Sequence, residues 1–251
     1  MNTEKSSQTD SFRFRVRKKV YKFWWSVWKR TVGAYRYGMG RSESFSQGGE
    51  DLIVAAIWKK YLDDKSDFRY LDIGAHHPMH ASNTCLLYQR GARGINIEAD
   101  PILFELFPKE RAEDTNLNIG IGAENSEKAD FYVMKQRDCS TFSREMMEYY
   151  TQTNFTCLDY VVQVPLRTID SVLESLSAGS LDFVNIDVEG LDFSILKAWN
   201  FERHHASVFC VETNKEDTCD EIRKLMRNAG YVVFEQTGKN TIFVDKKILT
   251  R

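Results

Sequence analysis

The sequence lacks the features that mark secreted and membrane-spanning proteins. Its five cysteines form no CxxC pair and have no regular spacing, and an odd number without a framework favours reduced thiols in the cytosol. The apolar clusters near the N-terminus are interrupted by Lys22, Ser26 and Lys29, far short of the ~20 residues that a spanning helix needs. The basic start is not followed by the apolar core and cleavage site of a signal peptide. We expect a cytoplasmic protein that is soluble or lies on a membrane surface.

Acidic residues are missing from one segment. Residues 11–42 contain ten Lys and Arg and no Asp or Glu, so they carry +10 and leave −12 on the rest of a chain whose net charge is −2. Aromatic side chains, among them Trp24, Trp25 and Trp28, are interspersed with these bases. The pattern predicts a basic aromatic arm or helix over residues 1–42, joined to an acidic domain over residues 43–251.

Three interpretations of the arm stay open. Its tryptophans can pack on the larger domain. They can also pack on a second subunit, and the protein would then be a homodimer. Its bases and tryptophans also suit an anionic membrane surface at the inner face of the membrane. Nucleic-acid binding uses similar residues, but the acidic body makes it unattractive, and no nucleic acid is expected.

From Ser46 onward, helical and strand-like runs alternate, and no internal repeat is present. The periodicity predicts helices at 49–61, 84–90, 101–107, 168–176, 191–199 and 220–229, and strands at 69–73, 94–98, 117–121, 181–187 and 207–212. Further strands are expected at 129–134 and 161–165, and a hairpin at 231–235 and 241–244. This order predicts an α/β fold with a doubly wound, mostly parallel sheet, to which the hairpin adds an antiparallel strand at one edge. The stretch 139–159 is expected to be irregular, either a lid or acceptor-binding wall or a surface excursion.

The loop after the strand at 69–73 lacks two of the glycines that a dinucleotide site requires. A pyrophosphate needs GxGxxG, but the four residues after Gly74 are Ala-His-His-Pro. Gly74 still permits close backbone approach of a ligand at the end of the strand. Glu98, at the end of the next strand, can accept both hydroxyls of a ribose. The loop therefore favours a cofactor without phosphates over a nicotinamide cofactor.

Five motifs in a fixed order extend this interpretation. They are Ser46-Gln-Gly-Gly-Glu-Asp51, Leu71-Asp-Ile-Gly-Ala-His-His-Pro78, Ser82-Asn-Thr84, Gly91-Ala-Arg-Gly-Ile-Asn-Ile-Glu-Ala-Asp-Pro101 and Asn185-Ile-Asp-Val-Glu-Gly190. Together they resemble the FkbM family of methyltransferases, over about residues 45–244. The resemblance implies a class I methyltransferase (Rossmann-like) fold with a seven-stranded sheet, S-adenosylmethionine as methyl donor, and O-methylation, usually of a sugar hydroxyl in a glycan or natural product.

The resemblance also implies a set of cofactor contacts. By position, Asp72, Gly74 and Ala75 would line the methionine portion, Glu98 and Ala99 would lie at the ribose, and Gly120, Ile121 and Gly122 would border the adenine. Gln47 and Asp51 would close over the cofactor from one side, Ser82, Asn83 and Thr84 from the other, and Asp187 would complete the set.

Methyl transfer to a hydroxyl needs a base or a metal ion. Asp187 and Glu189 lie at the end of one strand and Glu212 at the end of the next, so their charges are expected to crowd together. Crowding either raises a pKa toward that of a base or recruits a cation such as Mg²⁺. We predict Asp187 as base or metal ligand, with Glu189 in support, Glu212 as a second ligand, and His77 as a further base. Alternatively, Glu189 caps the following helix and Glu212 pairs with a lysine.

The leading hypothesis is an O-methyltransferase for a sugar hydroxyl of a glycan or glycoconjugate. A second hypothesis keeps the donor and takes a secondary-metabolite or lipid hydroxyl as acceptor. A third is a methyltransferase-like binding module without turnover, against which the intact set of Asp72, Gly74, Glu98, Asp187 and Glu189 counts.

Overall fold

The computed structural model describes residues 44–176, 179–213 and 216–250. The predicted arm over residues 1–42 lies outside these ranges, and so do the membrane and subunit contacts expected of it. Within the described ranges, no helix is long and apolar enough to cross a membrane.

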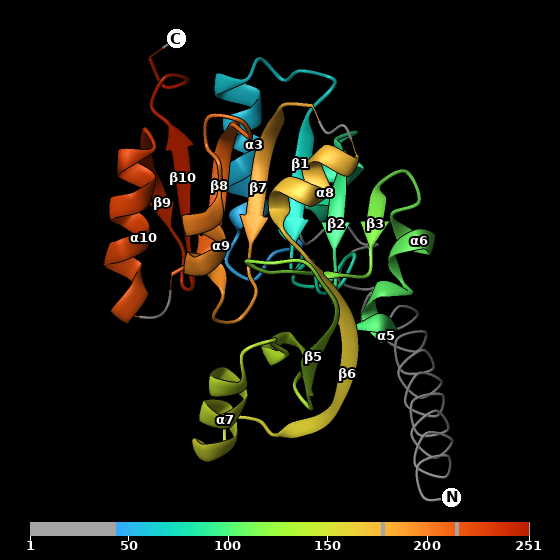
Figure 1. The fold of residues 1–251 in the computed structure, drawn as a ribbon. Coiled ribbons are helices and arrows are strands. Elements are labelled where there is room, and N and C mark those ends of the chain that lie inside the picture. The colour runs from blue at the N-terminus through green and yellow to red at the C-terminus, as the bar shows by residue number, and fades with distance from the viewer. Residues whose placement is uncertain (1–43, 177–178, 214–215, 251) are drawn as a thin grey trace, which may run out of the picture. The chain divides into compact units, whose positions relative to one another are not determined.

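A seven-stranded sheet forms the centre of the fold (Figure 1). Its strands are β1 (Arg69–Ile73), β2 (Arg93–Ile97), β3 (Thr115–Leu117), β7 (Leu181–Ile186), β8 (Ala206–Glu212), β9 (Tyr231–Gln236) and β10 (Asn240–Asp245). They lie in the order β3-β2-β1-β7-β8-β10-β9, and the first five are parallel to one another. The reversal of strand order between β1 and β7 places a ligand site at their carboxyl ends. This confirms the predicted doubly wound, mostly parallel α/β sheet.

The predicted hairpin adds its antiparallel pairing at one edge of the sheet, as expected. β10 is antiparallel to both β8 and β9 and lies between them, so the edge strand is β9. Burial explains the order. Every residue of β10 is buried, whereas β9 is exposed from Val232 to Gln236. A strand that is apolar on both faces is stable only with neighbours on both sides.

Helices cover both faces of the sheet. They are α3 (Glu50–Tyr61), α4 (Cys85–Gln89), α5 (Pro101–Phe104), α6 (Phe107–Glu110), α8 (Ile169–Ser175), α9 (Asp192–Ala198) and α10 (Glu216–Asn228). In Figure 1, α8 and α9 lie in front of the sheet and α3 lies behind it. One core cluster lies between the sheet and the front helices, where Val184 and Phe209 of the strands pack with Leu173 and Leu196.

Two predicted elements divide in the structure. The helix expected at 101–107 is interrupted between α5 and α6, because Pro108 has no N–H to continue the hydrogen-bond ladder. The strand expected at 117–121 is also two strands. β3 ends at Leu117 in the main sheet, and β4 (Gly120–Ile121) pairs instead with a strand of a second sheet.

The second sheet contains β4, β5 (Ser126–Met134) and β6 (Leu158–Arg167), in the order β4-β6-β5. The stretch expected to be irregular follows a short 3-10 helix (Arg137–Cys139) and contains α7 (Arg144–Gln152), so that prediction was wrong. α7 begins where the Ser143 hydroxyl accepts a hydrogen bond from Met146 N at 3.2 Å, a helix start that the apolar periodicity does not reveal. Figure 1 shows β5, β6 and α7 beyond the carboxyl ends of the parallel strands.

Candidate active site

A cavity that is partly open to solvent lies at the carboxyl ends of the parallel strands. Its walls come from the main sheet, from the segment that contains β4 and β5, and from the hairpin turn before β10. The predicted residues on its wall are Gln47, Asp72, Gly74, Ala75, Asn83, Glu98, Ala99, Gly120, Ile121, Asp187 and Glu189. The fold thus brings together residues that are more than 100 positions apart in the sequence.

The Asp72 carboxylate accepts hydrogen bonds from two neutral side chains. The Asn185 amide, on the adjacent strand β7, donates to one carboxylate oxygen at 2.9 Å, and the Thr84 hydroxyl donates to the other at 2.7 Å. The Arg111 guanidinium donates to Thr84 Oγ1 at 3.2 Å. Burial nevertheless raises the pKa of Asp72 above its usual range. These contacts fix the direction in which Asp72 faces the cavity.

Glu98 is anchored by backbone amides. One carboxylate oxygen accepts from His76 N at 2.7 Å and the other from Asp100 N at 2.6 Å. Each oxygen keeps a further lone pair for a ligand hydroxyl. Burial, with the nearby Asp100 charge, raises the pKa of Glu98 to about 8.

One end of the cavity is apolar. Ile119, Ile121, Phe131 and Phe142 line it, and the two phenylalanine rings lie 4.7 Å apart between centroids. Gly120 is required here, since a Cβ at that position would lie 2.3 Å from the Phe142 ring. An apolar wall of this kind suits an aromatic base.

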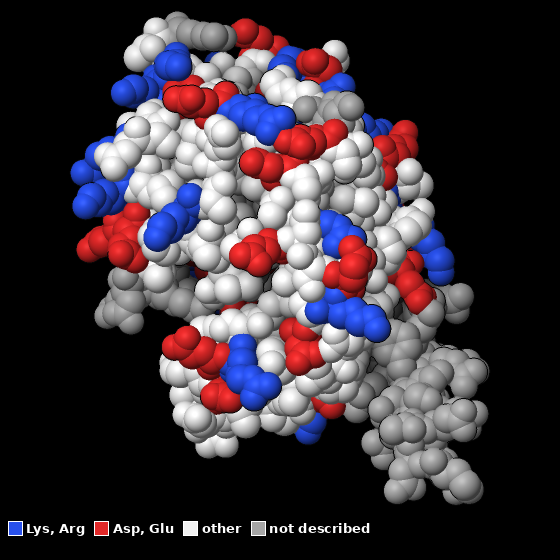
Figure 2. Space-filling view, viewed as in Figure 1, with Lys and Arg blue, Asp and Glu red and all other residues white. Residues whose placement is uncertain are grey.

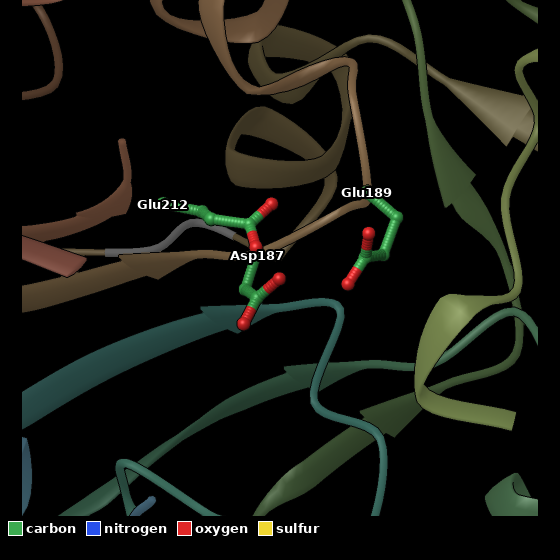
Figure 3. A group of neighbouring side chains, drawn as sticks. All are labelled: Asp187, Glu189 and Glu212. Carbon is green, nitrogen blue, oxygen red and sulfur yellow. The ribbon is translucent and has the colours of Figure 1, made fainter. Parts of the chain in front are cut away.

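The other end of the cavity is acidic. Asp187, Glu189 and Glu212 each place a carboxylate oxygen within 4.8 Å of the other two. Figure 3 shows Glu212 and Asp187 side by side at the ends of their strands, with Glu189 turned toward the same space from the loop after β7. Burial and then the charges of Glu212 and Glu189 raise the pKa of Asp187 well above its usual value. Burial lowers the pKa of Lys239, at the rim of the cavity. The charges of the same carboxylates have the opposite and larger effect, so the pKa of the lysine is raised.

Several predicted residues do not line the cavity. Asp51 is buried and accepts hydrogen bonds from Ser44 Oγ at 2.7 Å and from Phe45 N at 2.7 Å, so it organises the chain before α3. Asp51, Ser82, Thr84, Gly122, His77 and Glu212 are all absent from the lining.

The histidine prediction needs a correction. His77 is buried, and its Nδ1 accepts from Met79 N at 3.1 Å and from His80 N at 3.0 Å, so it stabilises the turn that follows it. The neighbouring His76 lines the cavity instead, and burial lowers its pKa. A left-handed backbone at His76, with φ 50°, reverses which of the two side chains faces inward, and the sequence gives no sign of it.

Sequence reasoning also missed residues on the cavity wall. Ser140 and Phe142 come from the stretch considered as a lid or acceptor-binding wall, Asp138 lies just before that stretch, and Lys239 comes from the hairpin turn. Asn185 lies in one of the five motifs, and its place between two strand residues with buried apolar side chains was the signal that could have found it.

The balance of acids and bases on the cavity wall indicates which cofactor the cavity can bind. The acids on its wall are Asp72, Glu98, Asp138, Asp187 and Glu189, and the bases are Arg137 and Lys239. Arg137 is further engaged in an ion pair with Asp100. An excess of acidic groups over bases disfavours a pyrophosphate, and a bound sulfonium or ammonium group in turn favours the ionised form of these acids. S-adenosylmethionine suits this balance of charge, and among the residues on the wall Glu98 could hold its ribose and Asp72 its methionine portion, with the apolar residues beside its adenine.

One family model matches the larger part of the chain. The methyltransferase FkbM domain matches residues 72–233. No curated protein matches the chain in a sequence search. Among solved structures, a TehB-like SAM-dependent methyltransferase from Corynebacterium glutamicum is 11% identical, covers 92% of this chain and 100% of its own, and has a TM-score of 0.41.

Two further solved structures are similar at the same level. The 1,6-didemethyltoxoflavin-N1-methyltransferase of Burkholderia thailandensis, with S-adenosylhomocysteine bound, is 10% identical over 89% of this chain and 88% of its own, with a TM-score of 0.38. The precorrin-6y C5,15-methyltransferase of Geobacter metallireducens is 13% identical over 77% and 86%, with a TM-score of 0.34. No acceptor is carried over from likenesses this distant. The FkbM domain match spans more than half of the chain and includes the cavity residues from Asp72 to Leu191, so the chain belongs to the FkbM methyltransferase family and is an S-adenosylmethionine-dependent methyltransferase.

Proposed function

We propose that this methyltransferase acts on a hydroxyl oxygen, and that the hydroxyl belongs to a sugar of a glycan or glycoconjugate. The acidic end of the cavity is the observation that carries the proposal. A hydroxyl must lose a proton as its oxygen takes the methyl group, and carboxylates at Asp187 and Glu189 can accept that proton or orient the hydroxyl. S-adenosylmethionine supplies the electrophilic methyl group when it is bound.

Asp187 is the base in this proposal. Its carboxylate lies at the cavity wall at the end of β7, where burial and the charges of Glu212 and Glu189 raise its pKa toward that of an effective base. Lys239 at the rim partly balances the cluster. Glu189 acts in support, since its own carboxylate accepts a hydrogen bond from the Tyr150 hydroxyl.

The substitution Asp187→Asn tests this role. A positioned base contributes about 10²–10⁴-fold to the rate, so the variant is expected to lose about that factor in methyl transfer. Its thermal stabilisation by S-adenosylhomocysteine should persist, which separates loss of chemistry from loss of the fold. Asp130→Asn, an exposed acid on β5, is the matched control and should retain the wild-type rate. Wild-type activity in Asp187→Asn would contradict the proposal.

A divalent cation is the alternative use of the same cluster. Three carboxylates with oxygens within 4.8 Å of one another have the ligand chemistry that Mg²⁺ prefers. Treatment with EDTA decides between the two roles. If activity survives EDTA, Asp187 acts as a base without metal. If it is lost and returns with Mg²⁺, Asp187 and Glu212 act as ligands.

The acceptor class is tested with a panel of hydroxyl compounds. Release of S-adenosylhomocysteine is measured with neutral oligosaccharides, nucleotide sugars, lipid-linked glycans and phenolic or lipid alcohols. Transfer to the sugars supports the proposal. Transfer confined to phenolic or lipid hydroxyls would favour a secondary-metabolite or lipid acceptor instead.

Residues 11–42 add a proposal about location. Their ten bases with interspersed tryptophans suit an anionic membrane surface, each base contributing about 1 kcal/mol near the headgroups. The full chain is expected to float with anionic liposomes at low salt, and a chain that lacks residues 1–42 is not. Absence of flotation at low salt would leave packing on the larger domain, or dimerisation, as the role of the segment.

A further inference from the structure

An exposed aromatic cluster lies on α7 and on the turn that follows it. The rings of Tyr149 and Tyr150 are 5.9 Å apart between centroids, and those of Tyr150 and Phe155 are 5.7 Å apart. Asn154 adopts a left-handed backbone with φ 55°, so the chain reverses after α7 and Phe155 N donates to Tyr150 O at 3.1 Å. The turn thereby places the Phe155 ring against Tyr150.

The exposure of this cluster is unusual. Phe155 is 59% exposed and Tyr149 57%, the two highest values among the large apolar side chains that the structure describes. α7 buries none of its residues. Leaving aromatic faces in water contributes nothing to the core, and contiguous exposed apolar surface commonly marks a binding site.

The cluster is continuous with the active site. The Tyr150 hydroxyl donates a hydrogen bond to the Glu189 carboxylate, which lines the cofactor cavity beside Asp187. Thr141, just before α7, donates from its hydroxyl to Glu189 O at 3.0 Å. A molecule that packs on the Tyr150 ring therefore lies near Glu189, one of the two carboxylates proposed to accept the proton.

Charge around the cluster selects the kind of ligand. Residues 144–159 contain three acids, Glu145, Glu148 and Asp159, against one base, Arg144. Among the described residues on the face shown in Figure 2, basic and acidic side chains are interspersed without a large area of positive charge. A phosphorylated, sulfated or nucleic-acid ligand is disfavoured by this balance.

We infer that Tyr149, Tyr150 and Phe155 form a platform that binds a neutral sugar ring of the acceptor. The C–H face of a pyranose packs on the electron-rich face of an aromatic ring. The hydroxyls of the sugar stay at the edge of the pyranose, where they can donate hydrogen bonds to carboxylates. The inference rests on the proposed function, and it adds where the acceptor binds and that the sugar is uncharged.

The test measures binding directly, so the acceptor need not be identified beforehand. The full chain, saturated with S-adenosylhomocysteine, is applied to an array of neutral, sialylated and sulfated oligosaccharides. The double variant Tyr149→Ala/Phe155→Ala removes the two most exposed rings, and Val233→Ala, an exposed apolar residue on the edge strand β9, is the matched control. Binding to neutral oligosaccharides is expected to fall about tenfold or more in the double variant, equivalent to about 1.4 kcal/mol, and to persist in Val233→Ala.

Three results would overturn the inference. They are preference for sialylated or sulfated glycans, equal binding by the double variant, and no binding to any glycan of the array. A dimer that becomes a monomer in the double variant, without glycan binding, would assign the cluster to a second copy of the chain. Failure of the proposed function looks different, because platform-dependent glycan binding would persist while S-adenosylhomocysteine release from sugar acceptors is absent.

Discussion

Gly74 lies directly against the backbone of Asp187. A Cβ atom at position 74 would be 1.8 Å from the Asp187 carbonyl oxygen, and the φ of Gly74 is 79°. The sequence suggested that this glycine makes room for a ligand, but the close approach is to another strand end of the same chain. Gly74 therefore sets the spacing between the cofactor loop and the proposed base.

Gly74→Ala is expected to disrupt both stability and cofactor binding. The left-handed backbone costs a non-glycine residue about 1–3 kcal/mol, and the overlap with Asp187 adds to that cost. Gly91→Ala is a matched control, because Gly91 has φ 99° but no atom within 4 Å of the added Cβ. Chemical denaturation and S-adenosylhomocysteine titration check both variants. A loss of stability no larger than that of Gly91→Ala, with cofactor affinity unchanged, would contradict this role.

The main sheet could be predicted because its strands are short apolar runs. Phe183, Val184 and Ile186 of β7 are fully buried, so hydrophobicity alone marks the strand and its end at Ile186, just before Asp187. The second sheet carries a weaker signal. β6 is largely exposed or half-buried, and its partner β4 has only two residues, which lie about 40 positions earlier in the chain. Local periodicity cannot reveal a pairing that depends on contacts so distant in sequence.

The residues of the site also divide into those that the sequence could predict and those that it could not. Asp72 and Glu98 could be predicted because they lie at the ends of neighbouring parallel strands, where topology alone brings side chains together. Tyr150 and Lys239 could not, since they reach the cavity region from a helix and from a hairpin turn whose positions are set by tertiary packing. The interchange of His76 and His77 depends on a single backbone torsion.

Asp187→Asn is expected to increase the stability of the cofactor-free protein. Burial and the charges of Glu212 and Glu189 raise the pKa of Asp187 above the 3.8 of an ordinary aspartate. With a folded pKa above the unfolded one, the stabilising contribution is present below about pH 4 and is lost as pH rises through the folded pKa. The wild type should therefore lose stability with rising pH, and the variant should lose less.

Urea denaturation of both proteins between pH 5 and 9 measures this difference, at about 1.4 kcal/mol per unit of pKa shift removed. Asp130→Asn, remote from the cluster, should follow the wild-type curve. Identical pH dependence in wild type and Asp187→Asn would mean that the cluster is not crowded in solution.

Glu98 should make cofactor binding depend on pH. Burial and the Asp100 charge raise its pKa to about 8, so the carboxyl is largely protonated at pH 7 in the cofactor-free protein. Hydrogen bonds from both ribose hydroxyls favour the ionised form of Glu98. Binding of S-adenosylhomocysteine at pH 7 should therefore release a proton. Affinity should rise as pH approaches 8 and then level off, by up to about tenfold per pH unit. Isothermal titration in buffers of different ionisation enthalpy detects the proton, and Glu98→Gln should abolish its release.

Thr84 is expected to act on the cofactor through Asp72. Its hydroxyl donates to Asp72 at 2.7 Å and accepts from Arg111 at 3.2 Å, so it connects a buried guanidinium to a cavity carboxylate. Thr84→Val keeps the shape but leaves a buried carboxylate oxygen without this donor, at a cost of about 1–3 kcal/mol. Thr84→Ser keeps the hydroxyl and is the matched control.

Titration with S-adenosylhomocysteine shows whether loss of the Thr84 hydroxyl weakens only the fold or also cofactor binding. If Thr84 only stabilises the fold, Thr84→Val lowers the unfolding midpoint and leaves the affinity of the folded protein unchanged. If it orients Asp72, affinity falls as well, and the pH dependence of binding shifts because the pKa of Asp72, already raised by burial, rises further without its donor. We expect the second result, with Thr84→Ser close to wild type in both measurements, because the Thr84 hydroxyl bonds Asp72 and makes no cap at the start of α4.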